Sequence, residues 1–168
     1  MSDFAIRLAA ENDLEAIRDI YNYYVRTSTC TYQIELDTAE ERRAWFRERS
    51  AKHPATVAEA DGVVIGWAAL SPWKSRCGYA WAAEASVYIH HAHHRRGLGK
   101  ALLLDLIERA KAAGLHTIIG GASSDQSASL ALQVALGFIP IGTFREVGRK
   151  FDRWLDVTYT QLLLKPEN

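Results

Sequence analysis

The chain has 168 residues, of which 48% are hydrophobic, and its 20 Lys and Arg balance its 20 Asp and Glu. This length suits a single domain with a sizeable core, which we expect to span residues 1–168. The neutral balance gives no reason to expect a nucleic acid or an anionic membrane as partner, and no apolar run approaches the ~20 residues of a transmembrane helix. The first residues do not resemble a signal peptide, and Cys30 and Cys77 lack Cys-x-x-Cys spacing, so we expect a cytoplasmic protein.

The N-terminal half predicts a strand, two helices and a β-hairpin. Two capping motifs indicate helix starts, because Asn or Thr followed by Glu three residues later can satisfy the first free amides: Asn12 with Glu15, and Thr38 with Glu41. Ala-Asp-Gly at 60–62 separates two apolar runs and indicates a hairpin. The expected elements are a strand at 4–8, a helix from about 12, a helix from about 39 that carries Trp45 and Phe46, strands at 55–59 and 63–70, and a loop at 71–80.

The C-terminal half alternates strands with helices and then returns to paired strands. Gly114 and Gly137 follow helical patterns and can end those helices in the left-handed conformation. The expected elements are a strand at 82–89, a helix at 98–113, a strand at 117–122, a helix at 127–136, and an antiparallel pair at 138–145 and 155–164. The first strands form a meander, the next strands alternate with helices, and the last two strands form a pair. This order indicates a mixed, largely antiparallel α/β sheet flanked by helices.

The turn that joins the strand at 82–89 to the next helix carries the strongest chemical signal. Gly97 and Gly99 would let a ligand approach the free amides at the start of that helix closely. A helix N-terminus also favours negative charge. The cationic side chains of the turn are Arg95, Arg96 and Lys100. This combination predicts a cradle for a pyrophosphate.

Two nucleotide-binding motifs are excluded here. A P-loop requires Ser or Thr where Ala101 stands, and a dinucleotide fingerprint requires a third glycine where Leu102 stands. The remaining pattern, x-x-x-Gly-x-Gly after a strand, resembles the acyl-CoA-binding motif of the GNAT superfamily of N-acetyltransferases, Gln/Arg-x-x-Gly-x-Gly/Ala. His94 stands at its first position, a departure that leaves the loop geometry intact.

Further strings extend the resemblance over nearly the whole chain, from about residue 5 to about residue 164. Together they resemble the phosphinothricin and methionine sulfone/sulfoximine N-acetyltransferase branch of the superfamily. The most specific are Glu-x-Ser-Val-Tyr at 84–88 and Arg-Trp-Leu-Asp-Val at 153–157, with Ala-Leu-Gly-Phe at 135–138. The resemblance implies the GNAT fold, with a splayed central strand at the acyl-CoA site, and it implies acetyl-CoA as co-substrate.

The resemblance also implies which residues contact acetyl-CoA. The splayed strand would offer backbone amides to the pantetheine and thioester, and Gln126 stands where the family has an Asn that contacts the cofactor. Gln133 stands where many members have a tyrosine that acts as general acid, so we expect that role to be vacant. The implied contacts are Val87, Tyr88, Ile89, Arg95, Arg96, Gly97, Leu98, Gly99, Lys100 and Gln126.

Glu84 is the candidate catalytic residue. An α-amine has a reference pKa near ~8, so at neutral pH some group must accept its proton before it attacks a thioester. Glu84 enters the strand that leads to the cradle and matches the glutamate that is the proposed base in the branch. A glutamate that only binds the substrate ammonium is the alternative.

The loop before that strand is the candidate acceptor site. A free amino acid carries a carboxylate, and Lys74 or Arg76 could pair with it. The alternative is that these two cations are solvated and that the aromatic residues belong to the core. The expected substrate-binding residues are Tyr32, Trp73, Lys74, Arg76, Cys77, Gly78 and Tyr79.

The histidines at 90, 91, 93 and 94 form a cluster without metal-ligand spacing, so we expect no metal. The leading hypothesis is an acetyl-CoA-dependent N-acetyltransferase that acetylates a small amino acid or analogue, of phosphinothricin or methionine sulfone/sulfoximine type, by direct transfer. The alternatives are a different amine or a protein N-terminus as acceptor, or a catalytically weak acyl-CoA-binding module. The resemblance also implies a homodimer.

Overall fold

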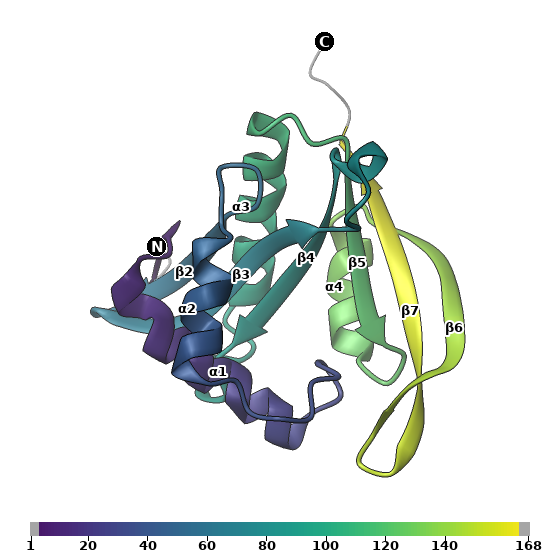
Figure 1. Cartoon of the computed structure of the whole chain (residues 1–168), viewed down its shortest axis with the longest axis horizontal. Coiled ribbons are helices and arrows are strands. Elements are labelled where there is room, and N and C mark those ends of the chain that lie inside the picture. The colour runs from purple at the N-terminus through teal and green to yellow at the C-terminus, as the bar shows by residue number, and fades with distance from the viewer. Residues whose placement is uncertain (1–3, 165–168) are drawn as a thin grey trace.

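The computed structural model describes residues 4–164, so the ends of the expected domain, 1–3 and 165–168, lie outside the described residues. The described part forms a seven-stranded sheet in the order β1-β2-β3-β4-β5-β7-β6, with four α-helices (Figure 1). This confirms the expected mixed α/β fold. The elements are β1 Ala5–Leu8, α1 Leu14–Thr27, α2 Ala39–Arg47, β2 Ala55–Ala60, β3 Val63–Pro72, β4 Ala82–Ile89, α3 Leu98–Ala112, β5 Thr117–Ser123, α4 Ser127–Ala135, β6 Ile139–Lys150 and β7 Arg153–Leu163.

The sheet consists of two antiparallel parts that meet at one short parallel contact. β1 to β4 form an antiparallel meander, and β5, β7 and β6 form the second antiparallel part. β4 and β5 run parallel and pair only through Ala82–Glu84 with Thr117–Ile119. Beyond these pairs the strands diverge, and Figure 1 shows the wedge between them opening downward. We call this wedge the split.

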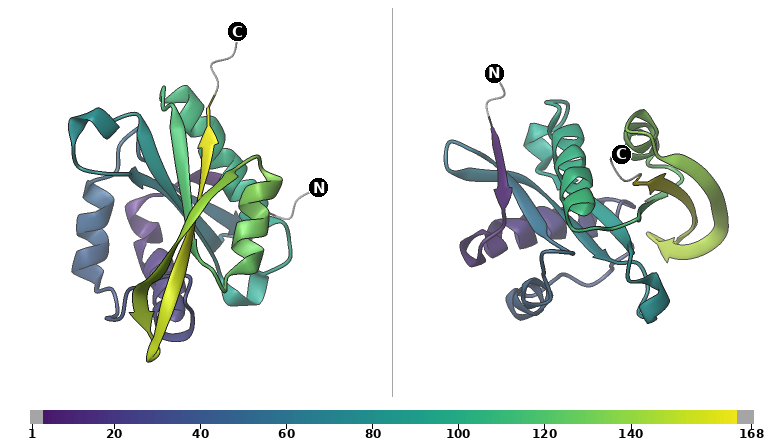
Figure 2. Two further views of the ribbon diagram at one scale, coloured as in Figure 1. Left: turned by 90° about the vertical axis from the view of Figure 1, so that its right-hand side faces the viewer. Right: turned by 90° about the horizontal axis from the view of Figure 1, so that it is seen from above.

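The helices cover both faces of the sheet (Figure 2). On one face, α3 packs through fully buried Leu102 and Leu106 against a core that includes Ile118 of β5, and α4 joins the same core. On the other face, α1 packs against β2 and β3 through buried Ile17. None of the helices in residues 4–164 is long and apolar enough to cross a membrane.

The expected cap at Asn12 is wrong, whereas the Thr38–Glu41 capping box is confirmed. Asn12 lies in a short 3₁₀ turn, and α1 begins at Leu14. Asp13 precedes α1 but makes no side-chain capping bond to it, because its carboxylate accepts the Ala10 amide at the start of the 3₁₀ turn at 2.7 Å. Arg7 of β1 holds that carboxylate with two hydrogen bonds of 2.7 and 2.8 Å and thereby holds the pKa of Asp13 below its usual value.

The last two strands are longer than expected. β6 continues to Lys150, and the hairpin turns at Phe151 and Asp152, which both have positive φ. The pairing shifts between Phe144 and Gly148, so a bulge interrupts the alternation of β6. The residues that extend β6 beyond position 145 are mostly charged and show no alternation of apolar and polar side chains. The sequence therefore does not predict a strand there.

Candidate active site

The split exposes one backbone edge of β4. The hydroxyl of Tyr24, from α1, donates a hydrogen bond to the carbonyl of Ile89, so the backbone groups of Ile89 point away from β3. Because alternate residues of a strand direct their amides to the same side, the N–H groups of Val87 and Ile89 face the split. Two residues expected to act through their amides are thus free of a strand partner on that side.

A cavity of about 270 Å³ occupies the split. Its walls come from β4, β5, α4 and the chain that follows α1, segments that lie far apart in the sequence. It brings together five of the residues expected from the sequence, namely Tyr32, Glu84, Val87, Tyr88 and Gln126.

Glu84 lies at the closed end of the split, in the last of the paired positions. It is partly buried, and burial raises the pKa of its carboxyl above the usual glutamate value. No other described residue forms an ion pair or hydrogen bond with this carboxylate. Glu84 is therefore a carboxylate with a raised proton affinity and free acceptor oxygens.

Tyr159 of β7 is a neighbour of Glu84 that sequence reasoning missed. Both side chains lie beside Gly121 of β5, where the Tyr159 ring would be 3.0 Å and a Glu84 oxygen 3.5 Å from an added Cβ. Burial and the nearby charge of Glu84 raise the pKa of Tyr159. The ring of Trp73 lies edge-on to the Tyr159 ring, with centroids 5.5 Å apart. Only the folded sheet reveals this cluster, since β4 and β7 are about seventy positions apart.

The anion cradle has the geometry that its glycines predict. Gly97 has φ +78°, in the left-handed region, and it directly precedes Leu98, the buried first residue of α3. The first amides of α3 have no acceptor within the helix and point outward from its N-terminus. The flanking cations are Arg95, Arg96 and Lys100, all exposed. The cradle can therefore hold a pyrophosphate.

The departure at His94 has a structural explanation. Nε2 of His94 is hydrogen-bonded to the Tyr24 hydroxyl at 2.6 Å, and the two rings lie parallel. The same hydroxyl binds the end of β4 through Ile89. His94 thus connects the cradle to α1.

The α4 side of the cavity presents two glutamines. Gln126 lines the cavity, and its amide donates to the Thr29 hydroxyl at 2.8 Å. Gln133 is buried, accepts the Thr160 hydroxyl at 2.5 Å and donates to Ser129 at 3.4 Å. A neutral amide therefore occupies the position of the family's acid tyrosine.

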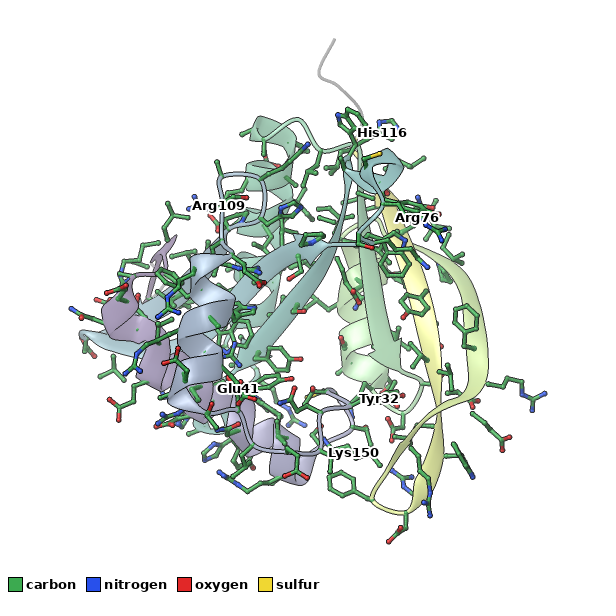
Figure 3. All side chains as sticks on the ribbon, in the orientation of Figure 1. Tyr32, Glu41, Arg76, Arg109, His116 and Lys150 are labelled. Atoms are coloured by element: carbon green, nitrogen blue, oxygen red, sulfur yellow. The ribbon has the colours of Figure 1, made fainter. Side chains whose placement is uncertain are left out.

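The loop of residues 73–79, which is expected to bind the acceptor, lies at the other end of the split from Tyr32. Figure 3 shows Arg76 above the closed end, and Tyr32 and Lys150 together below the open end. Trp73 is partly buried, with the Lys74 ammonium 5.5 Å from its ring centroid. The remaining residues expected in the loop, Arg76, Cys77, Gly78 and Tyr79, are exposed and do not line the cavity.

The histidine cluster packs mainly by ring contacts. His91 stacks on Tyr23 at 4.2 Å and on His90 at 4.4 Å. Burial and the neighbouring histidines lower the pKa of His90. Within residues 4–164 no group of three or more His, Cys, Asp or Glu side chains is placed to hold a metal ion.

Comparison with known proteins gives relatives that match the sequence of this chain over most of their length. The chain is 40% identical over 161 residues to the L-amino acid N-acyltransferase MnaT of Escherichia coli, covering 95% of this chain and 94% of the relative. It is 39% identical over 160 residues to the L-methionine sulfoximine/L-methionine sulfone acetyltransferase of Salmonella typhimurium, covering 95% and 94%.

A solved structure has the same fold. The phosphinothricin acetyltransferase of Sinorhizobium meliloti, in complex with AcCoA, superposes with a TM-score of 0.91 at 32% identity, covering 99% of this chain and 94% of that one. The family model described as "Acetyltransferase (GNAT) family" matches residues 17–138. The chain therefore belongs to the GNAT family of acetyltransferases.

Proposed function

We propose that this enzyme transfers the acetyl group of acetyl-CoA to the amino group of a small amino acid or analogue, of phosphinothricin or methionine sulfone/sulfoximine type. One observation carries the proposal. The partly buried Glu84 carboxylate, with no ion-pair partner among the described residues, lies in the same cavity as the free edge of β4. The relatives named above act on acceptors of this class. We further propose that residues 1–168 act as one domain.

Each part of the site has a role in this reaction. The cradle of residues 95–100 holds the pyrophosphate, and Gln126 lies along the pantetheine path. The amides of Val87 and Ile89 donate to the thioester carbonyl and stabilise the negative charge that develops on its oxygen. Glu84 accepts the proton of the attacking amine, directly or through one water molecule. The neutral Gln133 leaves the departing thiolate to be protonated by water.

The proposed transfer is direct, without a covalent acyl-enzyme. Cys30 is the thiol that lines the cavity. Burial raises the pKa of this thiol, so the nucleophilic thiolate is disfavoured at neutral pH. A cysteine in this state is a poor nucleophile, whereas the substrate amine next to Glu84 is activated by proton removal.

An acceptor screen tests the proposed function. Purified enzyme, acetyl-CoA and single free amino acids or analogues are combined, and the released CoA thiol is measured with a thiol reagent. We expect turnover with α-amino acids and none with their N-methylated quaternary derivatives. Turnover only with polyamines or with peptide N-termini would show that the acceptor is not a free amino acid. Tight acetyl-CoA binding without any turnover would indicate a binding module instead.

Recognition of the acceptor carboxylate is expected to depend on Arg76 or Lys74. Replacement by Met removes a charge-assisted contact worth roughly 1.5–3 kcal/mol. Because both side chains are exposed, we expect the lower end, a rise of about tenfold in KM for the amino acid. Initial-rate kinetics check this, with an unchanged KM for acetyl-CoA as the internal control. Equal activity of the unmodified enzyme on an amidated acceptor would exclude carboxylate recognition.

We also propose that the enzyme is a homodimer formed through β6. This strand is the edge of the sheet, and it presents a row of exposed apolar side chains. They are Ile139 at 64% exposure, Ile141 at 61%, Phe144 at 61% and Val147 at 58%. A second copy pairing with this edge would bury them.

Sedimentation equilibrium checks the dimer. We expect the mass of two chains for the unmodified protein and a shift to one chain for Ile141→Asp. Val63→Asp places the same charge on a side chain of 60% exposure at the start of β3, and it should leave the mass unchanged. An unmodified protein that sediments as one chain would refute the dimer.

The enzyme is proposed to act in the cytoplasm. Cys30 and Cys77 are both free thiols in the structure, and reducing conditions would keep them so.

A further inference from the structure

The chain after α1 crosses the open end of the split. Figure 1 shows it running below the gap between β4 and β5, and Figure 3 places Tyr32 there. Cys30, Thr31 and Tyr32 form part of the cavity wall. We call residues 28–32 the strap. Because the strap has no regular secondary structure, its position depends on contacts with its neighbours.

Lys150 makes the most unusual of these contacts. It is the last residue of β6 and only 5% exposed. Its ammonium donates hydrogen bonds to the carbonyls of Ser28 and Thr31, both at 2.7 Å, and to that of Tyr24 at 3.4 Å. Among residues 4–164 no carboxylate pairs with it. The ammonium is thus committed to backbone oxygens at the end of α1 and in the strap.

This arrangement has a physical logic. The carbonyls at the C-terminal end of a helix carry partial negative charge, so a cation is favourable there, and the Tyr24 carbonyl accepts the Lys150 ammonium in addition to the Ser28 amide. An ammonium has three N–H groups, which matches the three carbonyls that converge on Lys150. Burial removes water from the Lys150 ammonium and lowers its pKa. The hydrogen bonds to the three carbonyls offset the free-energy cost of burying this charge only while the strap stays in place.

The strap also forms hydrogen bonds with residues just before α4 and on β7. The hydroxyl of Thr29 donates to Asp125 at 2.7 Å and accepts from Gln126 at 2.8 Å, just before α4. The Tyr32 hydroxyl donates to the Asp156 carbonyl of β7 at 3.2 Å. The Tyr32 ring packs so closely on Gly148 of β6 that a Cβ there would clash with it. The strap therefore joins α1 to the half of the sheet beyond the split.

We propose that Lys150 is a positioning residue that holds the strap closed over the open end of the acyl-transfer cavity. It touches neither the reacting amine nor the thioester, and it acts through the backbone of residues 28–31. The inference rests on the proposed function for the meaning of the cavity, whereas the closure of the strap is a property of the fold alone. Closure would fix the wall opposite Glu84 during transfer.

Cys30 provides a direct readout of closure. It lies inside the strap and is partly buried, and the only other cysteine of the chain is the exposed Cys77. In a Cys77→Ser background, the rate of alkylation of Cys30 by iodoacetamide reports how often the strap opens, once the pH dependence of the rate has corrected for the thiolate fraction, because the Lys150 charge also lowers the pKa of Cys30. Lys150→Met keeps an apolar stem of similar length and removes the ammonium. Arg149→Met is the matched control, because Arg149 is the preceding residue of β6 and its side chain is 57% exposed.

The expected result is a rise of about tenfold or more in the alkylation rate for Lys150→Met, with the rate of Arg149→Met unchanged. Lys150→Arg should return the rate toward that of the parent, since a guanidinium can also donate to several carbonyls. An alkylation rate in Lys150→Met equal to that of the parent would overturn the proposal. If Lys150→Met does not fold, Lys150→Gln takes its place under the same criteria.

Kinetics in the same background separate this inference from the proposed function. We expect kcat of Lys150→Met to fall by about tenfold and KM for acetyl-CoA to change less, because the pyrophosphate cradle lies at the start of α3, although Gln126 is hydrogen-bonded to Thr29 of the strap. A fall in kcat for Arg149→Met of the same size would also overturn the positioning role. If the parent acetylates no amino acid, the proposed function fails, and the alkylation rates still decide whether Lys150 holds the strap.

Discussion

Glu84→Gln is expected to lower kcat/KM for the amino-acid acceptor by a factor on the order of 10²–10⁴ at neutral pH. The two side chains are nearly the same size, so the cavity keeps its shape. The amide cannot accept the amine proton, and the ammonium that dominates at this pH stays unreactive. Initial rates with acetyl-CoA at saturation measure the effect.

Two controls accompany this variant. Acetyl-CoA binding, measured by calorimetry, should be unchanged, because the cradle and the amides of β4 do not involve the Glu84 side chain. Glu108→Gln removes an exposed carboxylate from α3 and should retain full activity. Full activity of Glu84→Gln would remove Glu84 from the mechanism. A rise in KM for the acceptor with kcat unchanged would leave it a binding residue.

Gly99→Val is expected to weaken acetyl-CoA binding by about ten- to a hundredfold, the loss of one or two charge-assisted contacts of roughly 1.5–3 kcal/mol in total. Gly99 lies in the first turn of α3, where the phosphate must approach the free amides closely. An added Cβ would already lie 3.3 Å from Leu132 of α4, so Leu132 has to shift slightly, and a branched side chain would narrow the space beside the first amides of the helix. Calorimetric titration with acetyl-CoA measures the loss.

The matched control for this variant is Ala112→Val, which places the same β-branched residue at the exposed end of α3. Helix propensity changes by only about half a kcal/mol in each variant, in favour of Val over Gly at position 99 and against Val relative to Ala at position 112. We expect Ala112→Val to bind acetyl-CoA normally and both proteins to unfold cooperatively. Unchanged affinity in Gly99→Val would show that the pyrophosphate binds elsewhere.

Features of the fold with local causes could be predicted from the sequence. The capping box at Thr38 and the glycines that end α3 and α4 act within a few residues, and Gly114 and Gly137 do have positive φ. The start of α1 could not be predicted, because the 3₁₀ turn before it is held by the Asp13 carboxylate, which binds the Ala10 amide and Arg7 of β1. That contact depends on tertiary structure.

The residues of the site also differ in whether their roles follow from local sequence or from tertiary structure. Glu84, the free edge of β4 and the cradle lie within one continuous segment, so a motif can find them. Tyr159, Tyr24 and Lys150 reach the split from β7, α1 and β6, and their sequence positions carry no signal for it. Lys150 ends the charged C-terminal part of β6 and resembles a solvated surface residue in the sequence until the strap is placed beside it.

The pH dependence of kcat/KM, compared between the unmodified enzyme and Glu84→Gln, tests the central claim most directly. Burial raises the pKa of Glu84, so the unmodified enzyme should lose activity as pH falls through a value above the ordinary ~4.3 of glutamate. The activity of the variant should not show this fall at acidic pH. The factor by which its kcat/KM lies below that of the unmodified enzyme should shrink as pH rises toward the amine pKa near ~8, since more substrate then arrives deprotonated. A ratio of the two activities that stays constant from about pH 6 to about pH 9 would contradict Glu84 as the proton acceptor.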